Sequence, residues 1–161
     1  GPRWSTGAGA LRELPDPPPS RQWAFPAPLG EQDVVMLTLS EIVAIARHVR
    51  CDNVRRSMTL APLGDLRAPG TPPPVAADAQ GRSAQTFVLD VQVRRDGQVR
   101  RARVRGQDIY AVSAPLIVEA MERAVAGGVP APGSWSAGEA FDARGFLTSL
   151  APDAFALEIQ D

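Results

Sequence analysis

Alternating apolar and polar positions in the middle of the chain predict a β-hairpin. Residues 86–93 and 98–105 both alternate, and the Asp96-Gly97 pair between them suits a two-residue type I′ turn. This turn sets the register, which pairs Leu89 with Val104, Asp90 with Arg103, Val91 with Ala102 and Gln92 with Arg101. Apolar side chains then share one face of the hairpin, and an opposite-charge pair lies on the other.

After the hairpin, the pattern predicts a short strand and then an amphipathic helix. We expect residues 107–112 to form the strand and Ser113 to cap a helix that has Pro115 in its first turn and runs to about Ala126. Glu119 and Arg123 are four positions apart on its polar side. The apolar stripe, which we expect to lie across a sheet, comprises Leu116, Ile117, Ala120, Met121, Ala124 and Val125.

The remaining periodic segments complete an α+β fold. A strand is predicted over 33–39, a helix over 39–49 that begins with a capping box of Thr38 and Glu41, a helix from the cap Asp142 to residue 150, and a strand over 155–159. The fold class that follows is an antiparallel or mixed sheet with helices packed on one face.

Prolines indicate how the chain is divided. The sixteen prolines concentrate in residues 15–19, 26–28 and 69–74, where the missing amide donor favours extended connections. We expect residues 1–30 to be a proline-rich extended lead-in or linker and residues 31–161 to be a single α+β domain. A ligand for a proline-binding module is the alternative interpretation of residues 15–19, and the stiff linker is preferred.

Composition excludes several classes of protein. A chain of 161 residues with net charge −1 has room for one core, and no apolar run is long enough to span a bilayer. Cys51 is the single cysteine, so an internal disulfide is excluded and a reducing cytoplasm fits. All 17 basic residues are arginine, which excludes Schiff-base chemistry and a Walker-type lysine. Because the chain begins with Gly1, we expect processing or a longer parent protein.

The single histidine lies in a basic segment. His48 follows Arg47 and precedes Arg50 and Cys51, and together these residues could form an electropositive spot that holds a substrate carboxylate. One histidine excludes a multi-histidine metal site, and we expect no metal. The alternative, which the sequence favours, is an arginine-rich helix end beside a buried thiol.

Asp108 and Tyr110 are two positions apart on the predicted third strand. Residues at that spacing project to one face, so both side chains could face a cleft where the strand meets the helix. A core tyrosine with a satisfied hydroxyl is the preferred alternative on the residues alone.

Two binding functions are not expected. Thr6-Gly7-Ala8-Gly9-Ala10 has no preceding strand, and Arg12 occupies the place of the third glycine, so no cofactor-binding residues are assigned to this chain. The hairpin is rich in arginine but lacks aromatic residues on the same face, and the whole chain has no basic excess. We therefore expect no nucleic-acid partner. Because no apolar run is long enough to span a bilayer, we also expect no membrane partner.

Four segments resemble the C-terminal half of the bacterial saccharopine dehydrogenase-like oxidoreductases. They are residues 39–48 (LSEIVAIARH), 81–88 (GRSAQTFV), 105–115 (RGQDIYAVSAP) and 138–142 (GEAFD), and the third is the most specific. The resemblance covers roughly residues 20–152. Alanine stands at position 46, where the family pattern has proline before Arg-His.

The resemblance implies an α+β substrate-side and dimerisation domain of an NAD(P)-dependent oxidoreductase. The Rossmann domain that binds NAD(P) would be a partner outside this chain, a homodimer is implied, and this chain alone would be inactive. Arg47 and Asp108 would bind a small-molecule substrate, and His48 and Tyr110 would be catalytic by relaying a proton. The alternative is a stand-alone, non-catalytic binding or dimerisation module, followed by a self-sufficient hydrolase.

Overall fold

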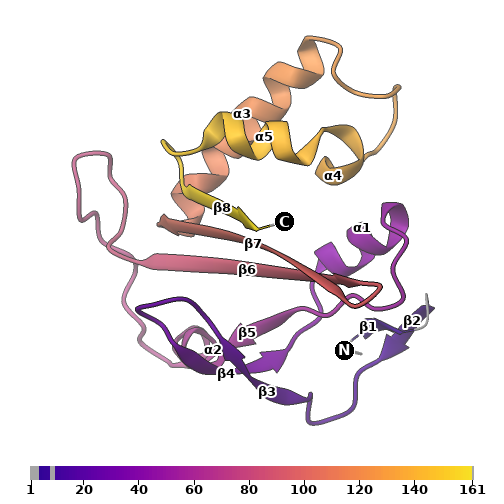
Figure 1. The fold of residues 1–161 in the computed structure, drawn as a ribbon. Helices are drawn as coiled ribbons and strands as arrows, with labels where there is room; N and C mark the ends of the chain where they lie inside the picture. The colour runs from indigo at the N-terminus through magenta and orange to yellow at the C-terminus, as the bar shows by residue number, and fades with distance from the viewer. Residues whose placement is uncertain (1–3, 8–9, 161) are drawn as a thin grey trace. The chain divides into compact units, whose positions relative to one another are not determined.

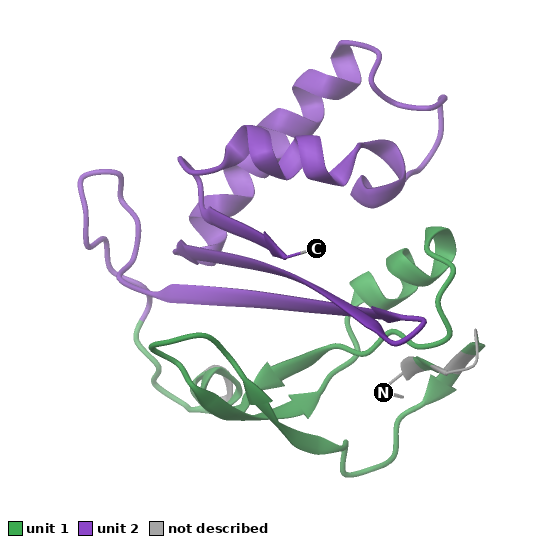
Figure 2. Cartoon of the chain, viewed as in Figure 1, with its two compact units in different colours: residues 1–72 green, residues 73–161 purple. Residues whose placement is uncertain are grey.

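The chain forms two compact units, residues 1–72 and residues 73–161, which are coloured separately in Figure 2. The computed structural model describes residues 4–7 and 10–160. The proline-rich segment 69–74, predicted as a connector, spans the division between the units. The boundary expected at residue 30 lies inside the first unit, at the end of a turn between two paired strands.

The first unit consists of short antiparallel strands and two helices. Strands β1 (Trp4–Gly7) and β2 (Ala10–Glu13) pair with each other, and a three-stranded sheet has the order β3-β4-β5. The other elements are β3 (Ser20–Ala24), β4 (Glu31–Met36), α1 (Ser40–His48), β5 (Ser57–Thr59) and α2 (Leu60–Arg67). Val34 of β4 and Ile42 of α1 are almost fully buried.

The predicted capping box at the start of α1 is wrong. Leu39 is the N-cap residue, and no side chain caps the helix. Glu41, which was expected to reach back to the amide of residue 38, instead forms an ion pair with Arg56, with Oε1 at 3.2 Å from Nε. Glu41 therefore pairs with Arg56, which immediately precedes β5, and not with the local amide.

The second unit is a three-stranded antiparallel sheet with helices on one side, and it confirms the α+β fold class (Figure 1). The sheet order is β6-β7-β8, from β6 (Thr86–Arg95), β7 (Gln98–Gln107) and β8 (Ala156–Gln160). The helices are α3 (Ile109–Val125), α4 (Ala137–Ala140) and α5 (Ala143–Leu150). Asp142 caps α5 as predicted, and its Oδ2 accepts from the Gly145 amide at 2.7 Å.

The hairpin prediction is confirmed in every pair. Leu89 lies opposite Val104, Asp90 opposite Arg103, Val91 opposite Ala102 and Gln92 opposite Arg101. Asp96 and Gly97 both have positive φ, 52° and 77°, as a type I′ turn requires. With a two-residue turn, one register places the apolar side chains of both strands on the same face of the hairpin. The prediction succeeds for that reason.

The predicted third strand over 107–112 is wrong, because α3 begins there. Strand β7 ends at Gln107, and Asp108 has φ 53°, which turns the chain directly into the helix at Ile109. Ser113 is therefore not a cap. Its hydroxyl donates to the carbonyl of Ile109, and Pro115 lies inside the helix rather than in its first turn.

The predicted buried stripe of α3 is only partly correct, because Leu116 and Ala120 are half-buried whereas Ala124 is exposed. Glu119 and Arg123, which were predicted on the polar side, face α5, where both contact the Ser149 hydroxyl. Ile117, Met121 and Val125 of the predicted buried stripe are 59%, 62% and 88% exposed. An apolar stripe shows that a segment is helical, but it does not by itself show which face of the helix is buried. Here α5 supplies polar and aromatic partners to the face that carries Glu119 and Arg123.

Candidate functional site

The four predicted site residues divide between the two units. Arg47 and His48 end helix α1 in the first unit, whereas Asp108 and Tyr110 lie at the start of α3 in the second. Each pair is therefore described separately, and their assembly into one substrate cleft stays a prediction.

Arg47 and His48 are both exposed at the end of α1. The Nδ1 atom of His48 lies 2.7 Å from the carbonyl oxygen of Ala44. In the tautomer that donates this bond, Nε2 is an acceptor and is available to a bound group. Cys51 is half-buried, and its Sγ donates to the Val49 carbonyl at 3.4 Å, so the thiol is not sealed in a core as the alternative interpretation required.

The Asp108 carboxylate is held by backbone amides on both of its oxygens. Oδ1 accepts from the amides of Tyr110 and Ala111, each at 3.1 Å, and Oδ2 accepts from the amide of Ser83 at 2.8 Å. Asp108 therefore caps α3 and also ties the loop before β6 to the start of that helix. With three amides already bound, the residue is well suited to position its neighbours.

A cluster of side chains supports this turn, and the sequence analysis did not find it. Gln107 donates from Nε2 to the Ser83 carbonyl at 2.9 Å and to Asp78 Oδ2 at 3.3 Å. Asp78 also forms an ion pair with Arg82, with Oδ2 at 2.7 Å from Nε. The local signal was the Asp-x-x-x-Arg spacing of residues 78–82, in which the Asp78 side chain closes a turn on the amides of Gln80 and Arg82.

Tyr110 projects outward from the first turn of α3. It is 75% exposed, so the interpretation as a core tyrosine is wrong. Its backbone amide is held by Asp108. The phenol is thus carried on a backbone fixed by the Asp108 cap, with its hydroxyl accessible from outside.

The amide of Ser83, followed by that of Ala111, holds the pKa of Asp108 below its ordinary value of 3.8. Because the folded state lowers this pKa, the ionised carboxylate stabilises the fold above the unfolded value. That contribution is lost as the pH falls through the lower, folded-state pKa.

We expect Asp108→Ala to lower the melting temperature at pH 7 by on the order of 5 °C, because the cap is lost and alanine disfavours positive φ. The difference in melting temperature between wild type and variant should become smaller below about pH 4. Thermal melts at pH 7 and pH 3 measure both effects. Asp108→Asn keeps an acceptor and tolerates positive φ, so it should lose less. Equal melting temperatures for wild type and the alanine variant at pH 7 would contradict the assigned role of Asp108.

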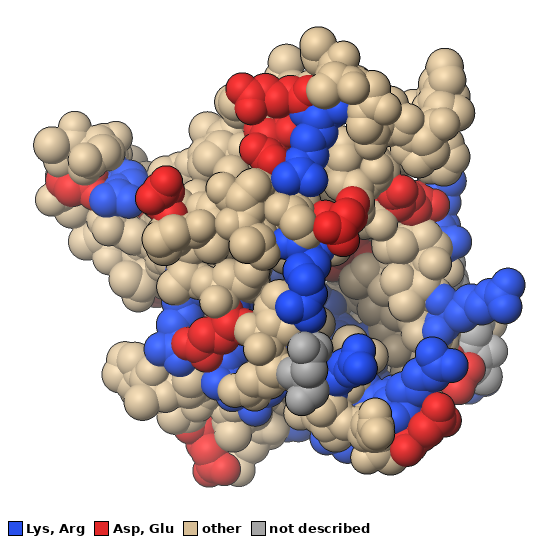
Figure 3. Space-filling view, turned by 45° about the horizontal axis from the view of Figure 1, so that its top comes forward, with Lys and Arg blue, Asp and Glu red and all other residues tan. Residues whose placement is uncertain are grey.

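Arginines of the hairpin are paired with acidic side chains rather than gathered into one basic surface. Arg101 and Arg103 both form ion pairs with Asp90, whose side chain is fully buried, and Arg103 and Arg105 reach Glu158 at 3.5 Å. On the face drawn in Figure 3, blue and red side chains lie next to each other at several places. The predicted absence of a nucleic-acid partner stays a prediction.

The glycine-containing segment near the start of the chain does not have the arrangement of a dinucleotide-binding loop. The segment that begins at Thr6 and contains Gly7 belongs to the β1–β2 hairpin rather than to a strand-turn-helix, and Ala8 and Gly9 lie outside the described residues. In the Rossmann fold the NAD(P) pyrophosphate lies at the amino end of the helix that follows the glycine loop, so this segment does not fit that motif. Within residues 4–7 and 10–160, no three metal-ligating side chains come together, and no helix is long and apolar enough to cross a membrane.

Comparison with known proteins gives no family assignment. No model of a known protein family matches the chain, and no curated protein matches it.

Proposed function

We propose that this chain is the substrate-side domain of a saccharopine dehydrogenase-like, NAD(P)-dependent oxidoreductase whose Rossmann domain lies outside the chain. In this proposal the 161 residues do not transfer hydride by themselves. They bind and orient a small substrate, and they supply a proton donor to the carbonyl or imine carbon–heteroatom bond that the cofactor domain reduces.

The observation that supports the proposal most is the hydrogen-bonded junction between two of the four resembling segments. Residues 81–88 and 105–115 are separated by most of the hairpin, yet Ser83 binds both Asp108 and Gln107. The most specific resembling segment is thus a fixed turn that presents Tyr110, rather than a surface strand of arbitrary sequence. An ordered turn that presents one exposed phenol is suited to a substrate-facing role.

Each candidate residue has a distinct role in this proposal. Arg47 holds a substrate carboxylate through its guanidinium group. His48 or Tyr110 transfers the proton. Asp108 contributes to substrate binding indirectly, because its carboxylate holds the backbone amide of Tyr110. No residue of this chain is assigned to the cofactor.

The proposal is tested by reading the coding sequence immediately upstream of Gly1. An in-frame strand, Gly-x-Gly-x-x-Gly and helix within roughly 200 codons would support a substrate-side domain of a larger oxidoreductase. A start codon directly before Gly1 would contradict it and favour the stand-alone module.

In the intact enzyme, we expect Tyr110→Phe and His48→Ala to have different effects on kcat. Substitution of the residue that transfers the proton should lower kcat about 100-fold or more. Tyr110 is 75% exposed and its hydroxyl makes no hydrogen bond within the described part of the chain, so Tyr110→Phe should leave the melting temperature unchanged. Steady-state kinetics and thermal melts measure the two effects. If both variants turn over like wild type, the assignment of these two residues is wrong.

A second candidate, the non-catalytic binding or dimerisation module, is favoured by one observation. The outward side of α3 carries Ile117, Met121 and Val125, all mostly exposed. A surface helix usually turns such side chains towards its own core, so a face of this kind indicates association.

A further inference from the structure

The sheet of the second unit has an uncovered apolar floor near the tip of its hairpin. Val91, Ala102 and Ile159 lie side by side across β6, β7 and β8. Val93 is on the same face, because side chains two positions apart on a strand project to one side. Val91 and Val93 are 57% and 58% exposed. The apolar face of a sheet is normally packed against another layer, so this part of the sheet offers an apolar surface to a ligand.

A hollow of about 200 Å³ lies on this floor. It is lined by the four apolar side chains and by two arginines, Arg100 of β7 and Arg144 of α5. No acidic side chain of the described residues lines it. The hollow therefore combines an apolar floor with a cationic rim.

Arg100 differs from the other arginines of β7 in its surroundings. Arg101, Arg103 and Arg105 form ion pairs with carboxylates on the opposite face of the sheet. Arg100 lies opposite Val93, and within residues 4–7 and 10–160 no acidic side chain forms an ion pair with it. Its charge is thus available to a bound anion.

Arg144 is the second residue of α5 and approaches the hollow from the helix side. A cation in the first turn of a helix is disfavoured by the helix dipole. The stability of α5 therefore does not account for an arginine at this position, whereas binding of an anion at the rim of the hollow does.

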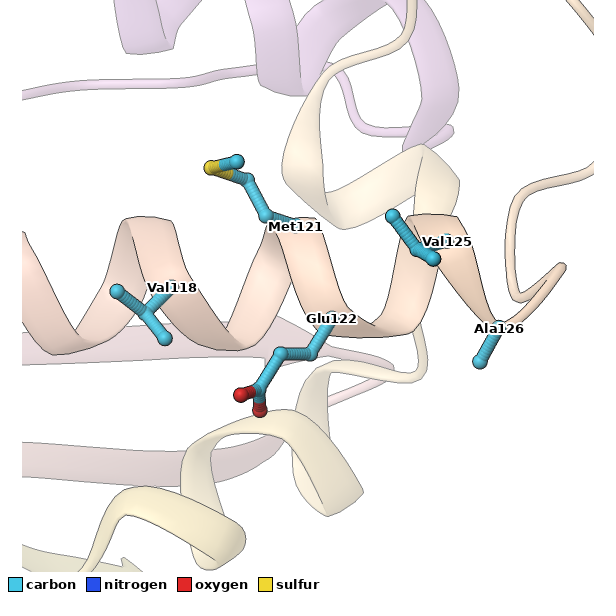
Figure 4. Close-up of a pocket in the computed structure, with 5 residues that line it drawn as sticks. All are labelled: Val118, Met121, Glu122, Val125 and Ala126. Carbon is cyan, nitrogen blue, oxygen red and sulfur yellow. The ribbon is translucent and has the colours of Figure 1, made fainter.

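A larger hollow on the same unit has the opposite charge. It lies on α3, has a volume of about 450 Å³ and is lined by Val118, Met121, Glu122, Val125 and Ala126 (Figure 4). The charged residue in this lining is acidic, and it would repel an anion. Of these two hollows, the one on the sheet is suited to an anionic ligand.

We propose that the hollow on the β6-β7-β8 sheet binds a short aliphatic monocarboxylate. The aliphatic tail lies on Val91, Ala102 and Ile159, and the carboxylate is held by the arginines at the rim. A guanidinium group matches a carboxylate because it donates two parallel hydrogen bonds to the two oxygens. A volume of about 200 Å³ has room for about six or seven groups of the size of a water molecule, which sets the length of the acid at about six carbons.

The position of the hollow favours a small ligand over an extended peptide. Ala102 belongs to β7, which is the central strand of the three. The floor therefore lies on the face of the sheet, whereas an extended peptide pairs with the backbone of an edge strand.

This inference does not rest on the oxidoreductase proposal. The candidate site of that proposal comprises Arg47, His48, Asp108 and Tyr110, and none of these residues lines the hollow. Carboxylate binding is measured on the 161-residue chain without a dinucleotide, so either proposal can fail while the other holds.

Sodium hexanoate is the probe for this site. In amide NMR spectra of the isotope-labelled chain, we expect the signals of Val91, Ala102 and Ile159 to shift and to saturate with a Kd on the order of 1 mM. Hexanamide, which has the same shape without the charge, should bind about tenfold more weakly. The absence of saturable shifts up to about 10 mM hexanoate would overturn the proposal, as would equal binding of hexanamide.

The length of the acid tests the size of the hollow. From butanoate to hexanoate, the affinity should rise by up to about fourfold for each methylene that is buried. From octanoate to decanoate it should rise no further, because the hollow is already filled. A steady rise to decanoate would indicate non-specific binding of an acyl chain and would overturn the proposal.

Substitution of the arginines tests the recognition of the carboxylate. Arg100→Gln and Arg144→Gln should each weaken hexanoate binding about fivefold or more. Arg100 is exposed, so Arg100→Gln should leave the melting temperature unchanged. Arg95→Gln is the matched control, because Arg95 is 89% exposed on the same hairpin and does not line the hollow. We expect wild-type affinity for this control, and equal affinities of Arg100→Gln and Arg95→Gln would overturn the proposal.

Discussion

Asp90→Asn is expected to lower the free energy of unfolding by about 3 kcal/mol. The Asp90 side chain is fully buried, and its Oδ1 accepts from Arg101 Nε at 2.7 Å while its Oδ2 pairs with Arg101 Nη2. Arg103 lies on the same carboxylate, with Nε at 3.8 Å, and only 16% of its side chain is exposed. The neutral amide leaves two poorly solvated guanidinium groups without their shared negative charge. Urea denaturation of the second unit measures the loss.

Asp96→Asn is the matched control, because it makes the same chemical change in the same hairpin. The Asp96 and Arg95 side chains are 91% and 89% exposed, and asparagine accepts the positive φ at this turn. We expect a change within about 0.5 kcal/mol. Equal effects of the two substitutions would show that the ion pairs of Asp90 with Arg101 and Arg103 do not stabilise the sheet.

Phe146→Ala should cost about 3–5 kcal/mol, because it empties the junction of α3 and α5. The Phe146 side chain is 8% exposed, its ring stacks on Phe141 with centroids 5.4 Å apart, and the Arg123 guanidinium lies 5.1 Å above its centroid. The substitution therefore removes buried area and two ring contacts together. Thermal and urea unfolding monitored by circular dichroism give the change in stability.

Two further variants distinguish a loss of core packing from a general sensitivity of the second unit to substitution. Phe146→Leu keeps most of the volume and should cost roughly half as much as Phe146→Ala. Val93→Ala removes an apolar side chain that is 58% exposed and should change stability by less than about 0.5 kcal/mol. A loss below about 1 kcal/mol for Phe146→Ala would contradict the inward assignment of the α3–α5 face.

Local sequence determined those elements that were predicted correctly. The β6–β7 register follows from a two-residue turn and strict alternation, and the α5 cap follows from Asp142 at the start of a helical segment. In both, the interacting groups are close in the sequence. The pattern alone was therefore sufficient.

Contacts between distant segments determined the rest. The β7–α3 junction depends on Ser83, twenty-five positions from Asp108, and the orientation of α3 depends on Ser149 and Phe146 of α5. Strand β3 lies in the proline-rich lead-in without an alternating pattern, and it forms because residues 20–24 pair with β4. A single sequence contains these partners but does not show that they meet.

The same limit applies to the candidate site. The sequence identified Asp108 and Tyr110 as candidates, and both lie at the same ordered turn. The pattern predicted that they lie on a strand, whereas Asp108 caps α3 and Tyr110 is in the first turn of that helix. The supporting cluster of Asp78, Ser83 and Gln107 was missed because two of its links join the loop before β6 to the end of β7.

Dinucleotide binding tests the proposed function most directly. Isothermal titration with NADH and with NADPH would compare the complete protein encoded by the gene with the chain of residues 1–161. We expect the complete protein to bind one of the two dinucleotides and the chain alone to bind neither. A complete protein that binds neither would contradict the oxidoreductase proposal, and binding to the chain alone would contradict the placement of the cofactor site outside it.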